Sequence, residues 1–209
     1  MYKYYLIGLS LIIASCSFQD TEPQKPKVKI SSVSSSFDEL QLPKFPDYPT
    51  PKTKLDEGVS GYIYYSIKSP YDFSRVLNGY DELQVHTGKA KLVMPDGASK
   101  KNPVPAVIIM HGSGGIKNGR ENGYAKLFSE NGIAALIIDY YEPRGVTKDT
   151  PYVMKTMIAT EVDIMSDAYS ALKILSTHPA IDPSRIGITG YSYGGMGARY
   201  VLDDRLKKI

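Results

Sequence analysis

A strand, a sharp turn and a helix, predicted in immediate succession, constrain this chain more than any other feature. The segment has the sequence RIGITGYSYGGMG. Its first residues, Arg185–Thr189, have the pattern of a short buried strand, and Met196–Leu206 is predicted to be a helix. Between them, Gly190 and Gly194 flank Ser192 in a G-x-S-x-G pattern. Strand and helix backbones nearly collide at such a turn, so the flanking positions must be small.

This arrangement predicts a nucleophile elbow, in which a serine stands clear of the sheet on a tight, strained turn. Ser192 is the candidate nucleophile, and the backbone N–H of Tyr193 is expected to point to where an oxyanion would form. Gly195 provides additional room behind the turn. The alternative is a glycine-rich surface turn with an incidental serine, but the strand before it and the helix after it favour the elbow.

The sequence GYSYGG at 190–195 resembles the α/β-hydrolase superfamily, and most closely its dienelactone hydrolase-like family. The type member of that family has a cysteine nucleophile, whereas this chain has Ser192, as esterases and peptidases of the superfamily do. The resemblance implies an α/β fold with a mostly parallel sheet flanked by helices. It also implies hydrolysis of a small-molecule carboxylic ester or related acyl substrate, with no metal and no organic cofactor.

A second glycine-rich segment, HGSGG at 111–115, follows the apolar run Ala106–Met110, which is typical of a strand buried on both faces. In α/β hydrolases the loop after this strand supplies another oxyanion N–H, and the resemblance assigns it to Ser113, with Gly114 as the fallback. A phosphate-cradling loop is the alternative, but no Gly-Lys-Ser/Thr follows and no G-x-G-x-x-G opens a helix. In the family, the histidine at position 111 orients this loop.

Strands alternate with helices along the rest of the domain, which predicts a parallel α/β sheet. Asp139 ends one buried strand beside Arg144, and is interpreted as shaping the pocket rather than as the acid of a catalytic triad. Strands are expected at 59–67, 83–94, 106–110, 134–138 and 185–189, the first two as antiparallel edge strands, and helices at 124–130, 153–175 and 196–206.

The acid and the base of a Ser–Asp/Glu–His triad are not found where this fold would place them. After Ser192 the sequence has Asp203 and Asp204, in the helix that follows the elbow, and no histidine. The remaining histidines, His86 and His178, lie on an early strand and in the loop that enters the elbow strand. The sequence therefore predicts a partial hydrolase domain at 58–209, truncated after the elbow helix.

Two functions of different classes stay open. The first is a serine-dependent ester hydrolase that is complete only with a separately encoded C-terminal fragment carrying the acid and the base. The second is a catalytically inactive split-gene or degenerate lipoprotein fragment. The DNA beyond codon 209 distinguishes them, because a continuing frame with an Asp and a His favours the enzyme.

The first 57 residues are predicted to be a signal peptide (1–15) and a flexible tether (16–57). The apolar run Leu6–Ala14 is much shorter than the ~20 residues that span a membrane, and Lys3 precedes it. The residues IASC at 13–16 resemble a bacterial lipobox, which predicts cleavage before Cys16 and its lipidation; a plain secretory signal is the alternative. Ser17 favours the outer membrane, so we expect a chain anchored in the bacterial cell envelope, at the outer membrane or facing the periplasm.

The tether prediction depends on its prolines and on a serine cluster at 31–36, a composition that stays extended and solvated. The net charge of +3 is too small to indicate a nucleic-acid partner, and no basic run is interleaved with aromatic residues. The 209 residues suit one domain with a sizeable core.

Overall fold

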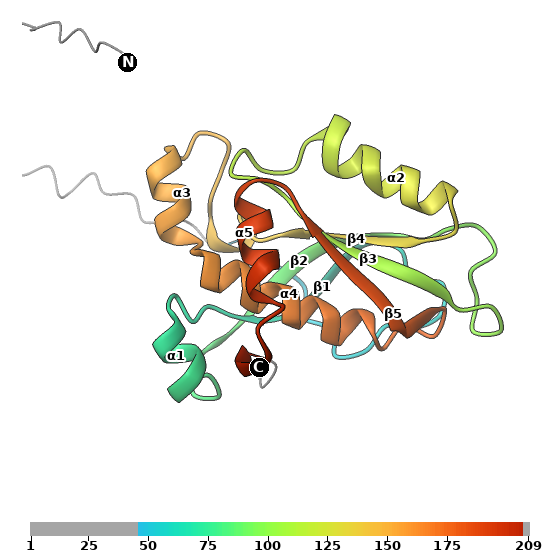
Figure 1. The fold of residues 1–209 in the computed structure, drawn as a ribbon, viewed down its shortest axis with the longest axis horizontal. Helices are drawn as coiled ribbons and strands as arrows, with labels where there is room; N and C mark the ends of the chain where they lie inside the picture. The colour runs from blue at the N-terminus through green and yellow to red at the C-terminus, as the bar shows by residue number, and fades with distance from the viewer. Residues whose placement is uncertain (1–45, 207–209) are drawn as a thin grey trace, which may run out of the picture. The chain divides into compact units, whose positions relative to one another are not determined.

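The structure, a computed structural model, describes residues 46–206. The predicted signal peptide, Cys16 and the first part of the predicted tether lie outside the described residues. The described residues all belong to one compact unit. Within it, five strands form one sheet in the order β1-β2-β4-β3-β5, with helices on both faces (Figure 1).

Two antiparallel strands lie at the start of this order. β1 (Gly61–Lys68) pairs with β2 (Val85–Val93), and β2 pairs antiparallel with β4 (Ala134–Asp139). The sequence predicts both as edge strands, but only β1 is one, because β4 occupies the other side of β2.

Three parallel strands complete the sheet and confirm the prediction for residues 106–110, 134–138 and 185–189. β3 (Val104–Met110) pairs in parallel with β4 on one side and with β5 (Ile181–Gly190) on the other. Successive residues of β3 are buried on opposite faces, which explains its continuous apolar run. Met110 pairs with Gly190, so the loops that follow β3 and β5 leave the sheet side by side.

The strand leading to Ser192 is less buried than its sequence predicts. Among residues 46–206, β5 pairs with β3 alone and forms the second edge of the sheet. Ile186 and Ile188 are half-buried, while Arg185 and Gly187 are exposed. An apolar pattern reports which side chains avoid water, but not how many neighbouring strands a strand has.

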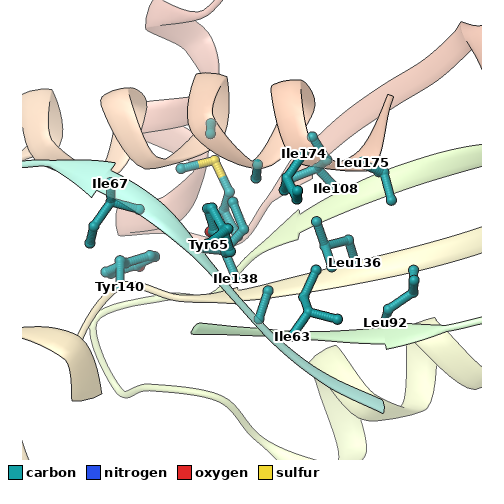
Figure 2. Close-up of a cluster of buried hydrophobic side chains, with 14 of the residues drawn as sticks. Ile63, Tyr65, Ile67, Leu92, Ile108, Leu136, Ile138, Tyr140, Ile174 and Leu175 are labelled. Atoms are coloured by element: carbon teal, nitrogen blue, oxygen red, sulfur yellow. The ribbon is translucent and has the colours of Figure 1, made fainter. Parts of the chain in front are cut away.

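Helices cover the two faces of the sheet. α4 (Glu161–Leu175) and α5 (Tyr193–Tyr200) pack on one face, and α2 (Gly123–Glu130) packs on the other (Figure 1). A short helix, α1 (Phe73–Asn78), follows β1. The larger core lies between the sheet and α4, where branched aliphatic side chains and two buried tyrosines interdigitate (Figure 2).

The single helix predicted at 153–175 is two helices, α3 (Tyr152–Ile158) and α4. The chain turns extended at Ala159, and Thr160 caps α4 with a reciprocal pair of hydrogen bonds. Asp163 N donates to Thr160 Oγ1 at 3.2 Å, and Thr160 N donates to Asp163 Oδ2 at 3.0 Å. This capping box satisfies the first N–H groups of α4 and therefore favours a new start over a continuous helix. The Thr-x-x-Asp pattern was available in the sequence, but the apolar spacing continues across it.

The helix predicted at 196–206 is shifted. α5 begins at Tyr193, directly after Ser192, and ends at Tyr200; a turn and a 3₁₀ segment at Asp204–Leu206 follow. The glycines that allow the close turn are themselves part of the helix, so the sequence pattern placed its start too late.

Residues 46–57, predicted to be part of the solvated tether, pack on the domain. Leu55 is 0% exposed and belongs to the main core, and Lys52 N donates to Tyr64 O at 2.8 Å. Tyr48 lies 5.1 Å from the Tyr64 ring and donates its hydroxyl to Glu142 at 2.8 Å. The predicted boundary at residue 58 therefore lies inside the packed unit, because a few apolar side chains suffice to dock a proline-rich segment.

Candidate active site

Ser192 has the backbone conformation of a nucleophile elbow. Its φ is 50° and its ψ is −116°, and α5 begins at the next residue. Such a conformation costs a non-glycine residue about 1–3 kcal/mol and persists only where the surroundings impose it. The N–H groups of Gly195 and Met196 donate to the Ser192 carbonyl at 2.9 and 3.2 Å, which ties the turn to the helix. The Ser192 residue itself is exposed.

The glycines on either side of Ser192 have no room for a side chain. A Cβ at Gly190 would lie 2.5 Å from the carbonyl carbon of Gly194, and a Cβ at Gly194 would lie 2.6 Å from Met110 O. Both obstacles are backbone atoms, which cannot move aside as a flexible side chain can. The close approach predicted from the G-x-S-x-G pattern is therefore present.

The structure brings the loop after β3 to the elbow. A Cβ built on Gly112 would lie 3.5 Å from Ser192 Cβ and 3.1 Å from Tyr191 O. Ser113 follows Gly112 and is half-buried at the end of the sheet where β3 and β5 finish. Among residues 46–206, the backbone N–H groups of Ser113 and Tyr193 have no hydrogen-bond partner. The two predicted oxyanion donors therefore lie in the β3 loop and at the first residue of α5, and neither N–H is used within the described residues.

The first turn of α5 is held from behind. The Tyr193 hydroxyl donates to Ala159 O at 2.7 Å, at the break between α3 and α4. Burial raises the pKa of Tyr193, so this hydroxyl stays protonated. A Cβ at Gly197 would lie 2.5 Å from Ile164 Cγ1, which shows how closely α5 packs on α4. The N-terminus of α5, with its partial positive charge, is thereby fixed beside Ser192.

His111 is buried beneath the site and is not paired with the serine. Its Nδ1 lies 2.7 Å from Gly112 O, and its ring stacks on Tyr140 with centroids 3.7 Å apart. The Tyr140 hydroxyl donates to the His111 carbonyl. Burial lowers the pKa of His111, against the raising effect of the bond to Gly112. These contacts orient the β3 loop, and within the described chain His111 has no hydrogen bond to Ser192.

The two histidines outside the β3 loop lie elsewhere. His178 Nδ1 accepts from Ala180 N at 3.1 Å, and its Nε2 lies 3.2 Å from Val59 O, before the start of β5. His86 is in β2, paired with Ile67 of β1. His178 thus lies at the opposite end of β5 from Ser192. His86 lies at the same end of the sheet as Ser192, but β4 and β3 separate its strand from β5.

Asp139 has a structural role at the end of β4. Its Oδ1 accepts from the backbone N–H groups of Tyr141 and Glu142, at 3.1 and 3.0 Å, and so holds the chain where it enters the 3₁₀ turn Glu142–Arg144. Arg144 is paired with Asp167 of α4 rather than with Asp139. Neither carboxylate has a hydrogen bond to a histidine in the described part of the chain.

Two residues at the site have no counterpart in the sequence predictions. Arg120 and Glu121 lie between β3 and α2, in a π-helical turn at Asn118–Asn122, and Glu121 is fully buried. Two adjacent opposite charges in a segment rich in Gly and Asn are typical of an exposed loop. No signal in the sequence shows that the Glu121 carboxylate is buried.

The hollow found in the described chain does not include the elbow. A hollow of about 440 Å³ lies between β1 and α4, lined partly by Lys52, Lys68 and Lys173, and no residue of the elbow or the β3 loop lines it. Residues 46–206 contain no group of three or more His, Cys, Asp or Glu side chains suited to a metal ion. None of the helices in this range is long and apolar enough to cross a membrane.

An open sheet whose strand runs into a serine of positive φ at a helix start is the arrangement found in the α/β-hydrolase fold. The Dienelactone hydrolase family matches residues 89–206, more than half of the chain. The chain therefore belongs to the Dienelactone hydrolase family.

Similar proteins include Esterase EstD of Thermotoga maritima, which is 30% identical over 122 residues, or 55% of this chain and 27% of the esterase. Among solved structures, a dienelactone hydrolase-like promiscuous phosphotriesterase from metagenomic libraries is 16% identical, with a TM-score of 0.46, over 66% of this chain and 53% of that one. Thermogutta terrifontis esterase 2, phosphorylated by paraoxon, is 18% identical, with a TM-score of 0.44, over 56% and 44%. This chain thus spans about a quarter of the curated esterase and about half of these structures.

Proposed function

We propose that this chain carries the nucleophile and the oxyanion donors of a serine-dependent ester hydrolase. Ser192 is the nucleophile, and the backbone N–H groups of Tyr193 and Ser113 are the oxyanion donors. The observation that carries the proposal is the positive φ of Ser192 at the junction of β5 and α5. Membership of the Dienelactone hydrolase family and the similarity to an esterase support a small-molecule ester or related acyl compound as the substrate.

In this mechanism Ser192 Oγ attacks the carbonyl carbon of the ester, and the carbonyl oxygen becomes an oxyanion. Two N–H groups and the positive end of α5 stabilise that charge as it forms. Collapse of the tetrahedral intermediate releases the alcohol and leaves an acyl group on Ser192, which water then removes as a carboxylic acid.

The proton of Ser192 needs a base, and the described residues do not place one beside it. His111 is buried against Gly112 O and Tyr140, and His86 and His178 lie elsewhere. We therefore propose that the base and its partner acid come from a polypeptide outside the described residues, such as a separately encoded C-terminal fragment.

Hydrolysis of p-nitrophenyl acetate by residues 17–209 tests this proposal. We expect little or no turnover. A triad without its base keeps at best a rate acceleration of about 10³–10⁴-fold over water, and this residual activity needs a complete pocket. A fluorophosphonate probe is expected to label Ser192 weakly. Adding a downstream polypeptide that carries the Asp and His is expected to restore both signals, and Ser192→Ala is expected to abolish them.

Two outcomes contradict the proposal. Turnover at ordinary enzyme rates by residues 17–209, lost in Ser192→Ala, would show that the base is within this chain, and His111 would be tested next. No activity with any downstream polypeptide would support the alternative, a catalytically inactive fragment. The observation that favours that alternative is that no histidine among the described residues is hydrogen-bonded to Ser192.

We also propose that Cys16 is lipidated and anchors the chain in a bacterial cell envelope. The support is the sequence IASC after a short apolar run, at the single cysteine of the chain. A fatty-acid probe is expected to label the wild-type chain and to spare Cys16→Ser. Equal labelling of both chains would refute the anchor.

A further inference from the structure

A buried carboxylate holds an arginine near Ser192. Both residues belong to the segment that leads from β3 into α2, whose course Figure 1 shows. Glu121 is 0% exposed. Its Oε1 accepts from Arg120 Nε at 2.8 Å, and its Oε2 accepts from Lys117 N at 2.8 Å. A carboxylate without access to water is tolerated only when it is paired and hydrogen-bonded, and these two donors meet that need.

The backbone that carries this pair is itself unusual. Residues Asn118–Asn122 form a π-helical turn, a rare conformation that occurs frequently at functional sites. Burying a carboxylate and forming a π-helical turn both cost stability. Their coincidence beside a strained serine indicates that the geometry of Arg120 matters, and not only the connection between β3 and α2.

The guanidinium of Arg120 and the side chain of Ser192 both lie close to Gly112 in the loop after β3. Its Nη2 is 3.2 Å from the position that a Cβ on Gly112 would take, and Ser192 Cβ is 3.5 Å from that same position. Its Cζ lies 5.1 Å from the ring centroid of Tyr191, the residue before Ser192. Tyr191 is held in turn by Tyr124 of α2, with centroids 5.5 Å apart.

The side of the guanidinium that faces away from Glu121 is free. Nε is occupied by Glu121, while Nη1 and Nη2 have no hydrogen-bond partner among residues 46–206. The side chain is 36% exposed, so a ligand can reach it. A guanidinium whose position is fixed and whose terminal N–H groups are free is suited to anionic oxygens, with a geometry that a lysine does not reproduce.

We propose that the terminal N–H groups of Arg120 bind an anionic oxygen beside Ser192, with Glu121 and Tyr191 as positioning residues. This inference rests on the proposed function, because ester hydrolysis at Ser192 is what supplies the anionic oxygen. One source is the oxyanion formed when Ser192 attacks, and the other is a carboxylate of the substrate or product. The competing explanation is that Arg120 serves only as the counter-ion of Glu121.

Acetate binding tests the carboxylate source without any need for turnover. The full chain is titrated with sodium acetate, against sodium chloride at the same ionic strength, while NMR follows the amides of Gly112 and Tyr193. We expect the signals to shift in the wild type and in Ser192→Ala. Arg120→Gln is expected to weaken acetate binding at least about tenfold, since it removes a charge-assisted contact. Arg75→Gln, the same charge change on the exposed surface of α1, is the control and is expected to have no effect.

Phenylboronic acid tests the oxyanion source. Ser192 Oγ donates an electron pair to boron, a B–O bond forms, the hydroxyl proton passes to buffer, and boron becomes tetrahedral and anionic. Boron NMR measures the tetrahedral fraction. If the oxyanion is the source, we expect Arg120→Gln to weaken this adduct at least about tenfold, by the same loss of a charge-assisted contact.

Two further variants separate charge from geometry. Arg120→Lys keeps the charge but not the planar guanidinium, and is expected to retain only part of the affinity. Glu121→Gln makes the site more positive, yet is expected to weaken binding, because Arg120 loses the partner that fixes its orientation. The amide spectrum of each variant shows whether it is folded.

The proposal is overturned if the wild type responds to neither anion, or if folded Arg120→Gln responds to both as the wild type does. Stronger binding in Glu121→Gln would refute the positioning role. Arg120-dependent acetate binding without a boronate adduct would count against Ser192 as the nucleophile while supporting the anion site. The hydrolase proposal and the Arg120 proposal can therefore fail separately.

Discussion

The buried ion pair between Arg144 and Asp167 predicts a large loss of stability when one charge is removed. Arg144 Nη1 and Nη2 donate to the two carboxylate oxygens of Asp167 at 2.7 and 2.9 Å, and the two side chains are 6% and 1% exposed. Nη1 also donates to Tyr140 O at 3.0 Å. Burial lowers the pKa of Arg144, but the Asp167 carboxylate outweighs it and raises that pKa. The pair joins the 3₁₀ turn after β4 to α4.

Asp167→Asn keeps the shape of the side chain and leaves Arg144 as a buried cation without a counter-ion. Two unit charges ~4 Å apart attract by about 4 kcal/mol at an effective dielectric constant of ~20. Removing one partner of a buried pair costs about 3–5 kcal/mol, and we expect a loss of this size for Asp167→Asn. That is a large part of the roughly 5–15 kcal/mol that a domain has in total.

Urea unfolding followed by circular dichroism at neutral pH measures this loss. The double variant Arg144→Met with Asp167→Leu is expected to cost much less, because it leaves no buried charge unpaired. Asp182→Asn is the matched control, since it removes one carboxylate from an exposed pair with Arg185, and we expect little change. A loss below about 1 kcal/mol for Asp167→Asn would refute the argument, since removing one partner of a buried pair costs several times that. A double variant as unstable as the single one would also refute it.

Three further predictions follow from the elbow and the loop beneath it. Ser192→Gly is expected to raise the free energy of unfolding by about 1 kcal/mol, because glycine relieves the positive φ, and an unchanged thermal midpoint would contradict the strain. Gly194→Ala is expected to lower the free energy of unfolding by about 2 kcal/mol or more, since its Cβ meets the Met110 backbone. The control is Gly114→Ala, whose Cβ meets only a lysine side chain. An equal or smaller loss in Gly194→Ala than in this control would refute the close approach. Because burial lowers the pKa of His111, the stability that its neutral form contributes is present above the unfolded pKa of 6.5 and is lost as pH falls through the lower folded pKa. Unfolding at neutral pH and at about pH 5 is expected to differ less in His111→Gln than in the wild type, and an equal difference would exclude His111 as the cause.

Much of the elbow could be predicted because its determinants are adjacent in sequence. The apolar strand, the two glycines and the serine follow one another, so their order alone fixes a close turn at Ser192. The apolar runs at 106–110 and 134–138 likewise identify strands buried on both faces. The predictions failed where a local signal competed with a longer pattern, as at Thr160, whose capping box interrupts the apolar spacing of the helix.

The sequence by itself determined the strands, the position of the nucleophile elbow and its match to the Dienelactone hydrolase family, since these depend on residue type and short spacing. The tertiary structure alone decided that β4 lies beside β2, that residues 46–57 pack on the domain, and that Arg144 pairs with Asp167. It also decided that Glu121 leaves the solvent and holds Arg120 beside Ser192. The physical reason is that burial and ion pairing depend on which surfaces meet after folding, and a charged residue has the same letter whether it faces water or a buried partner.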